Sequence, residues 1–352
     1  MKILLQCLRY LDRWILRLLL GRVIPTLILF LLSVWVAAIA YFSPALQLNC
    51  RSAAAVILLL LLLIIFLSKK YRIVALVLWA VSVTTVLSFY LQLEPSNNRT
   101  WENSVARMPS VMVKGDLVTI DGIRNFNYRT ETDYDRNYYS ETFDLAQISS
   151  VDIIVSYWSS KHIAHVMTSF GFDDGKYLNI SIETRKEATE QYSAIKGFFR
   201  NYELIYVASN ERDVIGLRTK FRNPNEKVYL MRLATSRARA RLLFEEFVKE
   251  MAQLQKRPDF YDTLLTNCTT QVFWHSHVNN PLLRFNWKVL LSGHIPEYLY
   301  DGGALDRSLV FEELMQKSLV NEVANLSLDS ERFSELIRAS VPRPPQRQDG
   351  AK

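Results

Sequence analysis

The first hundred residues contain three long apolar stretches, whereas later parts of the chain show shorter patterns of apolar and polar positions. The apolar stretches run over residues 23–42, 53–67 and 73–93. A membrane-spanning helix needs about 20 predominantly apolar residues. The first and third stretches reach this length, and the second is a few residues short, with residues 49–52 expected at the membrane interface. Residues 1–20 have apolar positions at helical spacing and a basic face, which predicts an interfacial helix.

After residue 94 the pattern changes to that of a mixed domain. Strand composition occurs at 111–123, 151–158, 164–172, 177–184, 204–208 and 228–233. Residues 236–256 carry an apolar stripe at helical spacing and end before Pro258, which predicts an amphipathic helix. Residues 126–143 are polar, rich in tyrosine and without a period, and predict a surface loop. This order predicts an α+β fold, an antiparallel sheet with helices grouped after it.

The same pattern divides the chain into three parts. We expect a membrane anchor over 1–94, a soluble domain over 95–341 and a disordered, proline-rich tail over 342–352. The first stretch has no small-residue cleavage site and two more spans follow it, so a removed signal peptide is not expected.

Charge is distributed unevenly between these parts. Residues 1–94 hold nine Lys and Arg against two Asp and Glu, whereas residues 95–352 hold 33 of each sign. A neutral domain lacks the basic footprint of a nucleic-acid-binding protein. Eight of the nine bases precede the first span or separate the second span from the third. The positive-inside rule therefore places the N-terminus in the cytoplasm and everything after residue 93 outside.

Cys268 is the most informative residue of the domain. It follows Thr266 and Asn267, either of which is a suitable helix N-cap, and an apolar-periodic stretch comes after it. A thiol in the first turn of a helix lies at the positive end of the helix dipole, which lowers its pKa toward the reactive thiolate. Cys268 is therefore a candidate nucleophile.

A base for this nucleophile is found on the predicted hairpin over 164–184. Its turn, Asp173 to Gly175, has glycine where a three-residue loop needs a left-handed residue. The resulting register places His165 directly opposite Glu183, and opposed side chains on one face have Cβ atoms about 5 Å apart. We predict that Cys268 attacks, His165 takes the proton and Glu183 orients the imidazole.

Plainer interpretations stay open at this stage. His165 is also typical of a half-buried strand residue, and Cys268 of a buried apolar one or of a disulfide partner for Cys50. His162 is a competing base, although it is expected in the turn before the strand, and His275 is either a ligand or a core residue. No metal-ligand set of typical spacing is found. One basic cluster is either a solvated helix start or a contact for lipid phosphates: Arg232, Arg237, Arg239 and Arg241.

Several motifs in order carry a family resemblance. They lie at Ile163–Phe172 with His165, Ser181–Glu187 with Glu183, Tyr202–Tyr206, Glu211–Asp213 and Phe260–Thr270 with Cys268. Over about residues 100–305 the chain resembles the Lnb-type N-terminal periplasmic domain family. The order of histidine, acid and cysteine is also similar to that of circularly permuted papain-like enzymes such as the lecithin:retinol acyltransferase family. The resemblance implies a permuted papain-like fold with Cys268, His165 and Glu183 as the catalytic residues, and no cofactor or metal.

The resemblance also implies a function and a location. Family members are linked to lipoprotein N-acylation, with a membrane phospholipid as acyl donor and the N-terminal amine of a lipoprotein as acceptor. The chain is then expected in a bacterial inner membrane, with its catalytic domain in the periplasm. Three spans are not a fixed part of the family pattern, which leaves the substrate of this chain open. The alternatives are a membrane-anchored cysteine peptidase or amidase of the cell envelope and a non-enzymatic assembly or envelope-binding protein.

Overall fold

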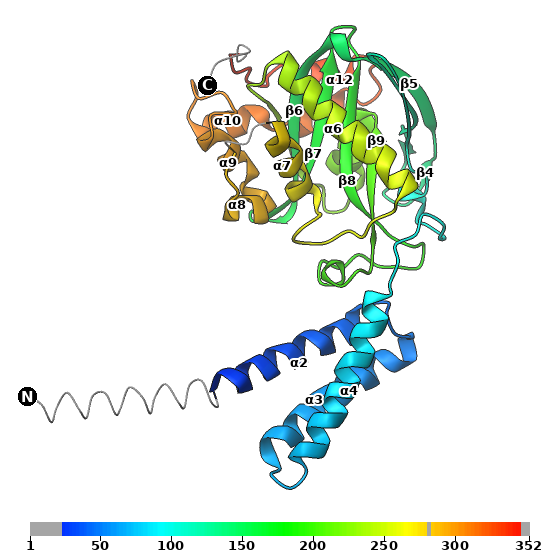
Figure 1. Ribbon diagram of the computed structural model, residues 1–352. Helices are drawn as coiled ribbons and strands as arrows, with labels where there is room; N and C mark the ends of the chain where they lie inside the picture. Colours follow the sequence, from blue (N-terminus) through cyan, green and yellow to red (C-terminus); the bar gives the residue numbers. More distant parts are fainter. Residues whose placement is uncertain (1–22, 280–282, 346–352) are drawn as a thin grey trace, which may run out of the picture. The chain divides into compact units, whose positions relative to one another are not determined.

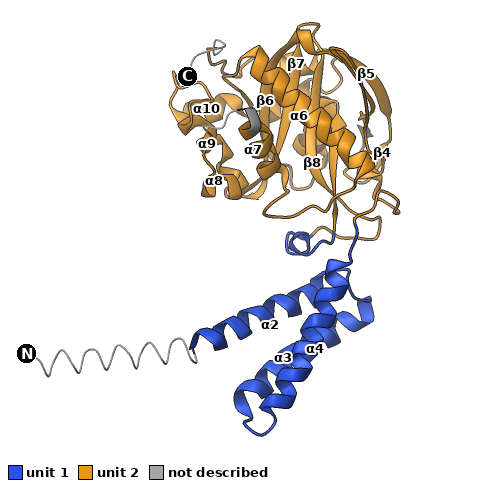
Figure 2. Ribbon diagram, in the orientation of Figure 1, with its two compact units in different colours: residues 1–94, 193–201 blue, residues 95–192, 202–352 orange. Residues whose placement is uncertain are grey.

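The computed structural model describes residues 23–279 and 283–345, and it separates the chain into two compact units (Figure 2). The first unit contains the chain up to Glu94 together with residues 193–201, and the second contains the remainder. The predicted interfacial helix over 1–20 lies outside the described residues, as does the predicted tail beyond residue 345.

Three apolar helices build the first unit. They are α2 (Ile24–Phe42), α3 (Leu48–Leu67) and α4 (Arg72–Leu91), and each is long and apolar enough to cross a membrane. The helix α3 begins five residues before the predicted start at residue 53 and takes in Arg51, whose side chain donates to the Leu46 carbonyl. The three helices pack around a shared core, in which the Trp79 indole donates to the Ser33 hydroxyl at 2.8 Å. The three predicted apolar stretches are therefore confirmed as helices.

The second unit is built around one large sheet (Figure 1). Its strand order is β1-β2-β9-β8-β7-β6-β10, with β5 paired to β2, and all pairs are antiparallel except β2 with β9. The sheet strands are β1 (Ser110–Lys114), β2 (Leu117–Arg124), β5 (Tyr138–Asp144), β6 (Ile148–Ser160), β7 (Ile163–Phe172), β8 (Tyr177–Arg185), β9 (Glu203–Ser209) and β10 (Lys227–Arg232). The short strands β3 (Asn127–Tyr128) and β4 (Tyr134–Asp135) pair with each other.

Two predictions for this region were wrong. The predicted strand over 111–123 is a hairpin, because Gly115 at φ 61° turns the chain between β1 and β2. The predicted loop over 126–143 contains three strands. Its tyrosines are not simply exposed to solvent, since the Tyr134 ring stacks on the buried Phe126 ring with centroids 5.1 Å apart. An ion pair between Arg129 and Asp133 also lies in this segment.

Helices cover both faces of the sheet (Figure 1). On one face, α6 and α7 bury an apolar core that includes Phe170, Phe244 and Phe247. On the other face, α5, α11 and α12 pack over Ile154 and Met167. The helices of this unit are α5 (Glu211–Gly216), α6 (Arg237–Lys256), α7 (Cys268–Asn279), α8 (Trp287–Leu290), α9 (Ile295–Asp301), α10 (Phe311–Ser318), α11 (Asn321–Leu326) and α12 (Phe333–Leu336). The chain is thus three N-terminal apolar helices followed by an α+β domain, as predicted.

The second face of the hairpin is polar in sequence yet buried in the structure. Ser169 and Asn179 are fully buried there. Ser169 donates to Glu211 at 2.5 Å, and Glu211 in turn pairs with Arg338 from the end of the chain. The Asn179 amide nitrogen donates to the Ser209 hydroxyl at 3.1 Å. Hydrogen bonds and ion pairs of this kind offset the desolvation cost of burying Ser169 and Glu211.

Candidate active site

The hairpin of β7 and β8 holds its predicted register. Phe172 donates to the Lys176 carbonyl at 3.0 Å, and Gly175 has φ 84° in the three-residue turn. The ladder pairs Met167 with Ser181 and Gly171 with Tyr177. Two residues beyond the Met167–Ser181 pair, toward the open end of the hairpin, the same register places His165 opposite Glu183 on one face of the sheet.

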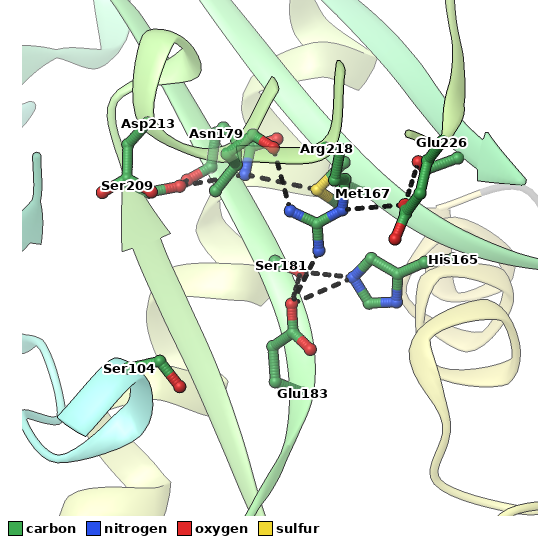
Figure 3. A network of polar contacts seen from close by, with 12 residues as sticks. Ser104, His165, Met167, Asn179, Ser181, Glu183, Ser209, Asp213, Arg218 and Glu226 are labelled. Carbon is green, nitrogen blue, oxygen red and sulfur yellow. Dashed lines mark hydrogen bonds and ion pairs between the residues drawn. The ribbon is translucent and has the colours of Figure 1, made fainter. Parts of the chain in front are cut away.

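His165, Ser181 and Glu183 form a closed set of contacts there (Figure 3). His165 Nε2 lies 3.1 Å from Glu183 Oε1 and 2.6 Å from Ser181 Oγ, and the Ser181 hydroxyl donates to Glu183 Oε1 at 2.7 Å. Since the single Ser181 proton goes to the carboxylate, the Ser181 oxygen accepts from His165, and Nε2 carries the imidazole proton. In the neutral ring Nδ1 is therefore the basic atom, free to take a proton from a nucleophile.

Cys268 opens helix α7, where the sequence predicted a helix start. Of the two predicted caps, Asn267 is the one used: its side-chain oxygen accepts from the amides of Thr269 and Thr270, both at 2.8 Å. The buried Cys268 thiol lies near enough to the His165 imidazole for each group to shift the pKa of the other, and its Sγ lies 3.8 Å from the Thr269 hydroxyl. The helix and the hairpin therefore bring nucleophile and base together.

The amide of Cys268 is the remaining donor of this helix start. The amides of Thr269 and Thr270 are occupied by the cap, and that of Gln271 donates to the Asn267 carbonyl. Within this described helix turn, only the Cys268 amide has no such partner. It is available to a negatively charged oxygen that develops beside the thiol.

The electrostatics favour an ion pair between the thiol and the imidazole. Burial alone raises the pKa of the Cys268 thiol, but the charge and hydrogen bond of His165 outweigh it and lower that pKa. Burial likewise lowers the pKa of His165, whereas the Glu183 carboxylate and the Cys268 thiolate raise it to about 9. His165 and Arg218 outweigh the effect of burial on Glu183 and hold its pKa well below the ordinary value. Thiolate, imidazolium and carboxylate are thus mutually stabilising.

Arg218 is a member of the site that the sequence did not reveal. It follows α5, in the short π-helix Leu217–Phe221, and is almost completely buried. Its guanidinium donates to Glu183 Oε1 at 3.3 Å (Figure 3). It also donates to the Val214 carbonyl at 3.0 Å. Because it lies 35 positions after Glu183 and outside any periodic pattern, no spacing rule could have placed it here.

The site lies in a segment that matches a known family. Residues 134–295 match the family described as the Lnb N-terminal periplasmic domain. The chain carries a domain of this family. No match was found among curated proteins or among solved structures. The matched part of the Lnb-type domain includes His165, Glu183, Arg218 and Cys268.

Two hollows of different chemistry adjoin the site of the Lnb-type domain. A cleft of about 460 Å³ is lined by His165, Glu183 and Arg218, with Trp158 and Tyr192 on its walls. A smaller cavity of about 60 Å³ has an almost wholly apolar lining that includes Val166, Val272, Phe273 and Val289, with Thr269 at its edge. The polar cleft is lined by His165 and the apolar cavity by the next residue of β7, Val166.

The other candidate histidines of the Lnb-type domain lie elsewhere. His162 is in the turn before β7, as predicted, and its Nδ1 lies 2.8 Å from His294 Nε2. His275 is a core residue, bonded to the Tyr206 hydroxyl at 2.7 Å, and burial lowers its pKa to about 4. Within the described ranges, no three His, Cys, Asp or Glu side chains are grouped as metal ligands.

Most arginines of the basic cluster form ion pairs, and Cys50 forms no disulfide within the described residues. Three of the four arginines are paired, Arg232 with Asp152, Arg237 with Asp173 and Arg241 with Asp116. Ion pairing at these positions favours a structural role over lipid phosphate binding. Cys50 is an exposed free thiol in the first unit, and Cys268 is free as well.

Proposed function

We propose that this protein is a thiol acyltransferase that moves an acyl chain from a membrane phospholipid to the N-terminal amine of a lipoprotein. The observation that carries the proposal is the contact of Cys268 with His165, which is itself bound to Glu183, within an Lnb-type domain. Membership of that family is shared with proteins linked to lipoprotein N-acylation. No cofactor is required by the chemistry.

The first half-reaction forms an acyl-enzyme. The Cys268 thiolate attacks the carbonyl carbon of a phospholipid ester, so that a C–S bond forms and the ester C–O bond breaks. The protonated His165 delivers its proton to the departing alkoxide, which leaves as a lysophospholipid. The Cys268 amide stabilises the oxyanion of the intermediate.

The second half-reaction passes the acyl chain on. A neutral amine attacks the thioester, the C–N bond forms and the C–S bond breaks. His165 Nδ1 takes the amine proton, and Cys268 returns to the thiolate. Glu183 keeps Nε2 protonated throughout, so that Nδ1 stays the reactive atom.

The two hollows suit a substrate with a polar and an apolar end. The apolar cavity beside Thr269 offers a place for the first methylenes of an acyl chain, and the polar cleft beside His165 offers one for the headgroup or the acceptor. Transfer in place of hydrolysis is favoured when donor and acceptor are both confined to one membrane, since confinement raises their effective concentration. We place the N-terminus in the cytoplasm and the Lnb-type domain in the periplasm of a bacterial inner membrane.

An acceptor assay tests this function. The full-length protein in phospholipid vesicles is given a peptide with a diacylglyceryl N-terminal cysteine and a free amine, and a matched peptide with an acetylated amine as control. We expect an amide-linked acyl chain on the first peptide and none on the second. Cleavage of either peptide without acylation would instead assign the site to a peptidase.

A further inference from the structure

Five large apolar side chains are exposed on α7, α8 and their neighbours. The exposed fractions are 46% for Trp274, 44% for Phe285, 54% for Trp287, 41% for Leu290 and 40% for Leu291. We refer to these five residues as the Trp surface. Single exposed apolar residues are normal on soluble proteins, whereas a group of large ones marks a surface that contacts something apolar.

The fold holds much of the Trp surface in an ordered arrangement. Trp274 and Phe285 stack with ring centroids 6.0 Å apart and planes at 11°, although α7 ends between them in the chain. The Phe285 ring also lies edge-on to Phe273 at 5.3 Å. Trp287 packs edge-on against His294 at 4.9 Å, and Val289 anchors α8 by being fully buried. These rings are therefore fixed outward by packing and are not loose side chains.

The charge around the Trp surface leaves one exposed base, Arg284. From Cys268 through Pro296 the sequence contains no Asp or Glu, and its charged residues are Arg284 and Lys288. Lys288 is held by Asp301 and Glu297, whereas Arg284 is exposed within the Trp surface between Leu283 and Phe285. Tryptophan, apolar side chains and an exposed base together are the composition of segments that bind at the lipid–water interface.

We infer that the Trp surface inserts into the headgroup region of the bilayer that the chain's own apolar helices cross. An indole ring suits this depth, because its ring is apolar and its N–H still reaches water or a headgroup oxygen. The same segments reach the site, since Phe273 and Val289 line the apolar cavity whose edge is Thr269, next to Cys268. Two further exposed leucines, Leu264 and Leu265, precede Cys268 in the chain. If the proposed acyl transfer holds, an acyl chain enters from the membrane at this surface.

The test is site-specific photo-crosslinking in the full-length protein. Benzoylphenylalanine replaces Trp274, Trp287 or, as a matched control, Leu326, which is 83% exposed at the end of α11. The proteins are reconstituted in vesicles of phosphatidylethanolamine and phosphatidylglycerol, irradiated, and analysed for lipid adducts by mass spectrometry. All three positions are exposed, and thermal unfolding of each variant checks that the replacement leaves the fold intact.

We expect severalfold more lipid adduct at positions 274 and 287 than at position 326. Equal yields at the three positions would overturn the inference, and so would adducts between two copies of the chain in place of lipid adducts. Repeating the measurement with Cys268→Ala separates the two proposals. Adduct formation needs no catalysis, so the pattern is expected to persist in this variant whether or not the acyltransferase function is correct.

Discussion

His162 and His165 are three residues apart in the chain, and both belong to a group of contacts that includes a carboxylate. His162 is exposed and meets His294 at 2.8 Å, and His294 Nδ1 lies 3.3 Å from Glu297. His165 is largely buried and contacts Glu183 directly, and the Cys268 thiol lies near it. The comparison teaches that an imidazole near a carboxylate is common. What sets His165 apart is a buried thiol close enough to interact with the same imidazole.

Removing the nucleophile is the change with the largest expected effect. Cys268→Ala should lower acyl transfer by about 10,000-fold or more, the scale expected when the nucleophile of a catalytic triad is lost. Cys50→Ala, at the other described free thiol, should leave the rate unchanged. The rates are measured with labelled phospholipid in vesicles, with thermal unfolding of each variant as the check on folding. Full activity of Cys268→Ala would show that the thiol beside His165 is not the nucleophile, so that it would no longer distinguish His165 from His162.

The two histidines can be compared directly. His165→Ala should lower the rate by about 100- to 10,000-fold, the usual contribution of a positioned general acid and base. His162→Ala should keep the rate, because its partner His294 lies away from Cys268. Both variants are assayed under the same conditions. An inactive His162→Ala beside an active His165→Ala would mean that the relay at His294 is the functional one.

Glu183 should show its role in the pH profile. The reactive pair is a thiolate with an imidazolium, so the rate should rise through the lowered pKa of Cys268 and fall through the His165 pKa of about 9. Glu183→Gln removes the charge that raises the His165 pKa, and the alkaline limb should move toward 6.5. Above the new pKa, each pH unit costs about a factor of ten in imidazolium. An unmoved alkaline limb would show that Glu183 does not act through His165.

Arg218 should produce the smallest effect, and in the opposite direction. Arg218→Met removes a positive charge that competes with His165 for the Glu183 carboxylate, so the alkaline limb should move to higher pH. We expect the rate to stay within about tenfold of the original, since a shift of one pKa unit corresponds to about 1.4 kcal/mol. Arg218→Lys should restore the original profile in part. A shift to lower pH in Arg218→Met would contradict this positioning role.

The parts of the site that the sequence predicted depend on local patterns. The Gly175 turn fixes the register of β7 and β8, which brings His165 to Glu183, and the Asn267 cap fixes the start of α7 at Cys268. Local rules were enough for each of these. The contact between helix and hairpin was proposed from chemistry alone, because nothing in the spacing encodes it.

What the sequence did not reveal depends on contacts between distant segments. The polar face of the hairpin is buried, because Ser169 is satisfied by Glu211, and Glu211 by Arg338 near the end of the chain. Arg218 reaches Glu183 only because α5 packs over that same face. Residues 126–143 form strands because their tyrosines pack against Phe126 and each other, which a scan for alternation does not detect.

The most direct test of the central claim is mass spectrometry of Cys268 after the full-length protein meets phospholipid in the absence of an acceptor. The account predicts an acyl group on the peptide that contains Cys268, released by neutral hydroxylamine as a thioester is. It should be absent from Cys268→Ala and strongly reduced in His165→Ala. An unmodified Cys268 in a protein that still transfers acyl chains, or an acyl group attached to another residue, would contradict it.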